Sequence, residues 1–121
     1  MMQGEPKMPL DPEEFKRRLG AMHASYRAKM PGKIAEIVAL WQRVRNSPPG
    51  DESREEFLLA AHTLAGSAPT LGCEALGAAA GRLERALRSA FSGEGLLSPA
   101  EAAAIGALVE KLGPSLDERE S

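Results

Sequence analysis

His23, His62 and Cys73 are the histidines and the cysteine of this 121-residue sequence, and imidazoles and thiols are side chains that act as nucleophiles and metal ligands. A neutral imidazole is a competent nucleophile near pH 7, because its unperturbed pKa is about 6.5. Two histidines cannot build a di-metal bundle site, which needs Glu-x-x-His on two helices, and neither begins a His-Glu-x-x-His motif. Cys73 is the only cysteine, which excludes a disulfide framework and a thiolate zinc cluster. The sequence therefore predicts no metal site, and without a Gly-x-x-x-x-Gly-Lys loop it predicts no P-loop nucleotide site.

His62 lies in a segment with helical periodicity, and its surroundings are small or apolar. At 100° per residue its side chain falls about 140° from Phe57, away from an apolar stripe that also holds Ala61, Leu64, Ala68 and Leu71. The positions nearest to it along the helix are Leu58, Leu59, Ala65, Gly66 and, one turn farther, Pro69. A glycine inside a helix costs about 1 kcal/mol against alanine, and a proline about 3 kcal/mol. A physical use for Gly66 is clearance, because another protein can then approach the imidazole closely.

Five helices are predicted to position this segment, and no alternating pattern supports a strand. The first begins at Asp11-Pro12, with an apolar face formed by Phe15, Leu19, Met22 and Tyr26. Pro31 interrupts it, so we expect a kink or a new helix there. The second helix carries an apolar stripe from Ile34 to Val44 and ends at the loop of residues 46–50.

The other three helices have recognisable ends. A capping box over residues 53–56 opens the third helix, and Gly72 closes it. The fourth buries Leu76, Ala80, Leu83 and Leu87, and a capping box over residues 98–101 opens the fifth. Ile105, Leu108 or Val109, and Leu112 line that last helix, which stops at residues 113–114.

Short links make sequential helices antiparallel neighbours. The predicted fold is therefore all-α, an up-down-up-down four-helix bundle with an additional N-terminal helix. Residues 1–10 are expected to be a flexible leader, 11–114 the bundle and 115–121 a flexible tail.

Composition narrows the class of protein further. The formal charge of −2 and the pI near 5.7 argue against a nucleic-acid partner. No segment resembles a membrane span or a secretory signal, so we expect a cytoplasmic protein without a membrane partner. Residues 12–46 carry eight basic and three acidic groups, and residues 93–121 carry two basic and six acidic groups. These charges are either solvated helix faces or a means of steering an acidic protein partner.

The segment from His62 to Gly72 resembles the signature of histidine-containing phosphotransfer (HPt) domains. In that family the phosphorylated histidine is followed by residues like Leu64, Gly66 and Ser67 here, and a hydrophobic-Gly pair like Leu71-Gly72 closes the helix. Leu76 and Leu83-Glu84 fit the continuation into the next helix. The family often has a lysine three residues after the histidine, where this sequence has Ala65. Substitute cations could come from Lys33, Arg82, Arg85 or Arg88, each of which is otherwise an ordinary surface charge.

The resemblance implies a phosphorelay intermediate. His62 would take a phosphoryl group from the aspartate of a response-regulator receiver domain, or from a sensor histidine kinase, and pass it to another receiver. The chain would be a phosphocarrier without a nucleotide site or a cofactor, because the Mg²⁺ and the acidic pocket would belong to the receiver. Docking would use Leu58, Leu59, Ala65, Gly66 and Pro69, and His62 would face solvent.

Two alternatives to this function remain open on the residues. The chain could be an HPt-like module that binds a receiver or kinase without carrying phosphate, or a plain helical-bundle adaptor. His23 lacks small neighbours and is interpreted as passive, and Cys73 is interpreted as a buried filler rather than a reactive thiol.

Overall fold

Residues 11–118 are described by a computed structural model of the chain, and they form five α-helices. The helices are α1 (Pro12–Val44), α2 (Glu52–Thr70), α3 (Glu74–Phe91), α4 (Pro99–Glu110) and α5 (Leu112–Asp117). No strand occurs in residues 11–118, so the all-α prediction is confirmed. The predicted leader, residues 1–10, and the last three residues of the predicted tail lie outside the described part of the chain.

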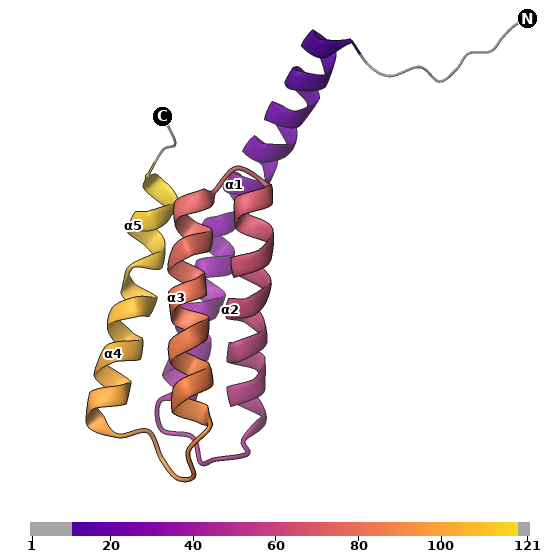
Figure 1. Ribbon diagram of the computed structural model, residues 1–121. Coiled ribbons are helices and arrows are strands. Elements are labelled where there is room, and N and C mark those ends of the chain that lie inside the picture. The colour runs from indigo at the N-terminus through magenta and orange to yellow at the C-terminus, as the bar shows by residue number, and fades with distance from the viewer. Residues whose placement is uncertain (1–10, 119–121) are drawn as a thin grey trace, which may run out of the picture.

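The helices pack side by side, and the chain reverses direction at each of the links after α1, α2 and α3 (Figure 1). α5 continues the course of α4, from which only Lys111 separates it. The largest helix interface is between α2 and α3, the two helices that flank the α2–α3 turn at residues 71–73. The N-terminal part of α1 extends beyond the end of the bundle that carries this turn (Figure 1).

α1 is one continuous helix of 33 residues with Pro31 inside it, so the expected separate N-terminal helix is not present. Packing on both sides of the proline explains why the helix continues. Tyr26 donates or accepts a hydrogen bond of 2.9 Å with Ser67 of α2 before the proline, while Ile37 and Trp41 are buried in the core after it. These contacts attach both halves to the same bundle and outweigh a local cost of about 3 kcal/mol.

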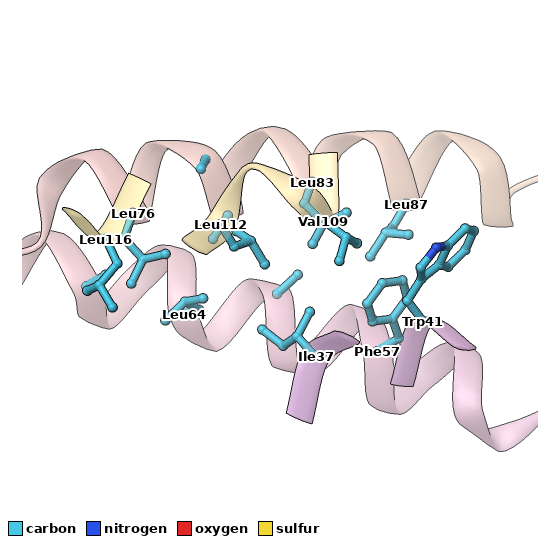
Figure 2. Close-up of a cluster of buried hydrophobic side chains, with 14 of the residues drawn as sticks. Ile37, Trp41, Phe57, Leu64, Leu76, Leu83, Leu87, Val109, Leu112 and Leu116 are labelled. Atoms are coloured by element: carbon cyan, nitrogen blue, oxygen red, sulfur yellow. The ribbon is translucent and has the colours of Figure 1, made fainter. Parts of the chain in front are cut away.

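The buried core is mostly aliphatic and runs the length of the bundle (Figure 2). Trp41 and Phe57 stack at one end with their ring centroids 5.9 Å apart. The predicted core positions of α3 and α4 are buried, with Val109 rather than Leu108 taking the fully buried position of its pair. The side chains labelled in Figure 2 come from all five helices: Ile37, Trp41, Phe57, Leu64, Leu76, Leu83, Leu87, Val109, Leu112 and Leu116.

Two helix starts follow the predicted capping and one does not. Asp11 caps α1 through a 2.8 Å bond from the Glu14 amide, and Ser98 and Glu101 form the capping box of α4. α2, however, begins at Asp51, whose carboxylate accepts the Ser53 amide at 3.0 Å. The predicted box at residues 53–56 is therefore wrong, because Ser53 is itself buried in the first turn of the helix.

The chain also stays ordered beyond the predicted stop at residues 113–114. α5 follows with Pro114 in its first turn, a position where a proline costs little because the missing amide has no partner in the helix. Ser115 and Leu116 are buried, and the Leu116 carbonyl accepts a hydrogen bond from the Arg27 side chain. The bundle thus reaches residue 117, and residues 115–117 are not part of a tail.

Candidate functional site

His62 stands on the exposed surface of α2, with 61% of its side chain accessible to solvent. The residues predicted to face the core from the same helix are buried, except that Leu71 is half-buried: Phe57, Ala61, Leu64 and Ala68 have at most 5% exposure. The angle between His62 and this stripe is therefore what brings the imidazole to the surface. The predicted exposure of His62 is confirmed.

Glu84 of α3 holds one side of the imidazole. The distance from His62 Nδ1 to Glu84 Oε2 is 2.7 Å. An ionised carboxylate can only accept a hydrogen bond, so the proton of a neutral His62 ring must reside on Nδ1. The other nitrogen, Nε2, then carries the free lone pair and is the atom available for nucleophilic attack.

Arg88 completes a cluster of three residues with His62 and Glu84, referred to below as the histidine cluster. Its Nη2 and Nε donate to the same Glu84 oxygen, at 2.7 and 3.1 Å. These bonds, and secondly the bond from His62, hold the pKa of Glu84 below its ordinary value. The carboxylate is therefore kept ionised beside the imidazole, where it can stabilise a positive charge on the ring.

The close approach of α2 and α3 that forms this cluster is visible at a second contact. The ring of Pro69 lies directly over Gly77, where an added Cβ would come within 2.4 Å of the proline Cγ. Seven residues separate Pro69 from His62 on α2, and seven residues separate Gly77 from Glu84 on α3. Both contacts thus belong to one antiparallel register.

The surface next to His62 is low and partly apolar, as the spacing predicts. Leu59 is 63% exposed, and Leu58 and Ala65 are half-buried. Gly66 is exposed, and a Cβ placed there would meet no atom within 4 Å. Packing inside the bundle therefore gives no reason for a glycine at this position. Pro69 is exposed as well, although one side of its ring is used against α3.

A cavity of about 420 Å³ lies between α1 and α2, beside this surface. Its lining includes Leu59 and Thr63, the neighbours of His62 on the side facing α1. Tyr26, Met30 and Ile37 supply its α1 wall. The low surface around the imidazole thus continues into an apolar groove.

Of the four candidate cations, only Arg88 is connected with His62 among the described contacts, and the connection runs through Glu84, to which both residues are bonded. Lys33 lines the groove and lies 3.8 Å from Glu36 in an exposed ion pair. Arg82 and Arg85 are exposed on α3 and take part in none of the ion pairs found among residues 11–118. Arg88 itself is 56% exposed and is engaged by Glu84.

His23 and Cys73 occupy different environments from His62. The His23 ring packs against Gly72, where a Cβ would lie 2.7 Å from its Nδ1, and its Nε2 is buried without a hydrogen-bond partner among the described residues. Gly72 has φ +92°, which suits the glycine predicted to close α2. Cys73 is 4% exposed, in agreement with its interpretation as a buried filler.

Glu84 is the residue of the candidate site whose contact with His62 the sequence did not reveal. The spacing of four residues between Glu84 and Arg88 suits the ion pair that they form along α3, but no local signal connects Glu84 with a histidine 22 residues earlier. Only the register between α2 and α3 makes that connection.

Within residues 11–118, no helix is both long enough and apolar enough to span a membrane.

A family model described as Hpt domain matches residues 21–113, which is most of the chain. The protein belongs to the Hpt domain family. Domains of this family are phosphocarrier modules of two-component phosphorelays, in which they interact with response regulators and kinases. Neither the curated proteins nor the solved structures include one significantly similar to this chain.

Proposed function

We propose that His62 is the phosphoacceptor of this domain and that it exchanges a phosphoryl group with the aspartate of a response-regulator receiver domain. The observation that carries this proposal is the bond between His62 Nδ1 and Glu84, on an imidazole that is otherwise exposed. It directs Nε2 toward solvent with its lone pair free. His23, the other histidine, has its Nε2 buried.

In the proposed reaction, Nε2 attacks the phosphorus of a receiver's aspartyl phosphate in line with the bond to the carboxylate oxygen. The N–P bond forms as the O–P bond breaks, and the electron pair leaves with the receiver's carboxylate. The ring becomes an imidazolium that keeps its proton on Nδ1, and the Glu84 carboxylate stabilises that charge. The reverse reaction returns the phosphoryl group to a receiver, and the Mg²⁺ is expected to be held by the receiver.

Docking is proposed to use the low surface around His62. Leu59 and Leu58 offer apolar contact, while Ala65 and Gly66 leave room above the ring. Pro69 extends this surface by one turn. A receiver must bring its aspartate within bonding distance of Nε2, and a bulky side chain at Gly66 would prevent that approach.

The test is phosphotransfer from radiolabelled receiver domains in the presence of Mg²⁺. We expect acid-labile, base-stable label on the full chain, no label on His62→Gln and full label on the matched variant His23→Gln. Label that persists on His62→Gln would overturn the assignment of the acceptor. Circular dichroism of each variant shows whether the bundle is intact.

An adaptor that binds a receiver without accepting phosphate is the second candidate. It is favoured by Ala65, which leaves no cation three residues after His62, and by the engagement of Arg88 with Glu84. The same experiment separates the two functions. A receiver that binds the wild-type chain but never labels it would support the adaptor.

A further inference from the structure

We propose that Arg88 is a positioning residue that acts through Glu84 and makes His62 Nε2 accept a phosphoryl group in preference to a proton near neutral pH. This inference rests on the proposed function and extends it to the control of the nucleophile. The observation that carries it is the arrangement of the imidazole and the guanidinium around a single carboxylate oxygen, Glu84 Oε2.

Glu84 Oε2 is the atom that joins the histidine cluster. His62 Nδ1 donates to it at 2.7 Å, and Arg88 Nη2 and Nε donate to it at 2.7 and 3.1 Å. The imidazole and the guanidinium therefore lie no farther apart than two hydrogen bonds. The side chain of Glu84 is 16% exposed, whereas those of His62 and Arg88 are 61% and 56% exposed. The carboxylate is thus the part of the cluster most shielded from water, and its charge acts on both neighbours more strongly than an exposed charge does.

A carboxylate alone at this place would favour protonation of the nucleophile. The first ring proton resides on Nδ1, where Glu84 accepts its hydrogen bond, so a second proton can only add to Nε2. The imidazolium that forms is stabilised by the same carboxylate. Its proton occupies the lone pair that must attack phosphorus. The bond that orients the imidazole therefore also favours its inactive form.

The positive charge of Arg88 distinguishes between a proton and a phosphoryl group on Nε2. A proton adds one positive charge to His62, which the nearby guanidinium opposes. A phosphoryl group arrives as PO₃⁻ and adds one negative charge, while the electron pair of the broken O–P bond stays with the receiver's carboxylate. The guanidinium attracts this added negative charge. Arg88 thus offsets the effect of Glu84 on protonation and favours the phosphorylated ring.

The other charges around His62 do not have this connection. On α3, Arg85 extends toward Gly81, where its Nη1 would lie 3.7 Å from an added Cβ, and it takes part in none of the ion pairs found among residues 11–118. On α1, Lys33 and Glu36 line the groove and lie 3.8 Å apart as an ion pair. The described contacts therefore join one cation, Arg88, to the carboxylate of the cluster. The neighbours of His62 three and four positions away on α2 are all uncharged: Leu58, Leu59, Ala65 and Gly66.

An NMR titration of the His62 ring signals in the full chain tests the proposal without any phosphotransfer, and His23→Gln assigns the signals. Arg88→Gln is expected to raise the midpoint of this titration by about half a pH unit, and Arg88→Lys, which keeps the charge, should restore the wild-type midpoint. Arg82→Gln is the matched control, because Arg82 is an exposed cation about 160° around α3 from Glu84.

The sign of the change separates control of the proton from a merely structural role. If Arg88 only held Glu84 in place, its removal would weaken the bond to His62 and lower the midpoint. A lowered midpoint, an unchanged midpoint, or an equal rise in Arg82→Gln would each overturn the proposal.

The pH profile of phosphotransfer gives the second readout. Single-turnover rates from one labelled receiver should rise with pH in the wild type and in Arg88→Gln, with the variant's profile displaced to higher pH. A displacement of half a pH unit makes the variant about threefold slower on the acidic limb of the profile. An undisplaced profile would overturn the proposal. If no receiver labels the chain but the NMR midpoint rises in Arg88→Gln, the proposed function fails, while the opposition of Arg88 to the proton is confirmed.

Discussion

The ring of Pro69 lies over the backbone of Gly77, with 2.4 Å between the proline Cγ and the place that a Cβ would occupy. This contact sets how closely α2 and α3 approach and which residues face each other along them. Two turns farther along both helices, the same register brings His62 Nδ1 to 2.7 Å from Glu84 Oε2. The proline and glycine that are costly for their own helices thus fix the geometry of the histidine cluster.

Gly77→Ala should therefore destabilise the bundle, although alanine favours a helix more than glycine does. The added Cβ clashes with a rigid ring, and such overpacking costs about 1–3 kcal/mol. Gly81→Ala is the matched control on the same helix, because its Cβ would meet only Arg85 Nη1 at 3.7 Å. Urea unfolding should place Gly77→Ala below Gly81→Ala in stability, and equal stabilities would contradict the role of the Pro69 contact.

Gly66 offers the opposite test, because a side chain there meets nothing within the bundle. Gly66→Ala should raise the stability by up to about 1 kcal/mol through helix propensity. Gly66→Arg should remain folded but lose phosphotransfer, since its side chain would cover the approach to His62. Transfer at the wild-type rate by a folded Gly66→Arg would show that clearance at this position is not needed.

Substitutions of Glu84 separate orientation of the imidazole from stabilisation of its charge. Glu84→Gln can still accept the Nδ1–H bond but lacks the negative charge, and we expect transfer to slow by about tenfold, or about 1.4 kcal/mol. Glu84→Leu loses both effects and should be slower still. Single-turnover rates with one labelled receiver are the measurement, and three equal rates would remove Glu84 from the mechanism.

The lowered pKa of Glu84 predicts a dependence of stability on pH. Hydrogen bonds from Arg88, and then from His62, make the folded state bind this proton less tightly than the unfolded chain. The resulting stabilisation is fully present above the ordinary pKa of 4.5, and it is lost as the pH falls through the lower folded value. The difference in Tm between the wild type and Glu84→Gln should accordingly shrink between about pH 6 and pH 3. A constant difference over this range would contradict the assignment.

Asp51 also has a lowered pKa, because the side chain and the amide of Ser53 donate to it. This carboxylate caps α2 in both the wild type and Glu84→Gln, so its titration cancels in the comparison of Tm values. The comparison therefore isolates Glu84 from the general acid sensitivity of the fold.

By itself, the sequence determined the features that depend on neighbours within one helix. The 100° step from Phe57 placed His62 outside the buried stripe, and capping signals located the beginnings of α1 and α4. Gly66 was identified as a gap beside the imidazole for the same reason, since both residues belong to one turn of α2. Such features follow from local geometry and need no knowledge of the fold.

Only the tertiary structure decided the features that depend on another helix. Pro31 is tolerated because both halves of α1 pack on one bundle. α5 forms because Leu116 is buried in the core. Phe15 is exposed because α1 is longer than its neighbours and extends past them. The spacing of residues within one helix does not show how long that helix is relative to the others. Glu84 meets His62 because α2 and α3 share one register, and that register is a property of how two surfaces fit together.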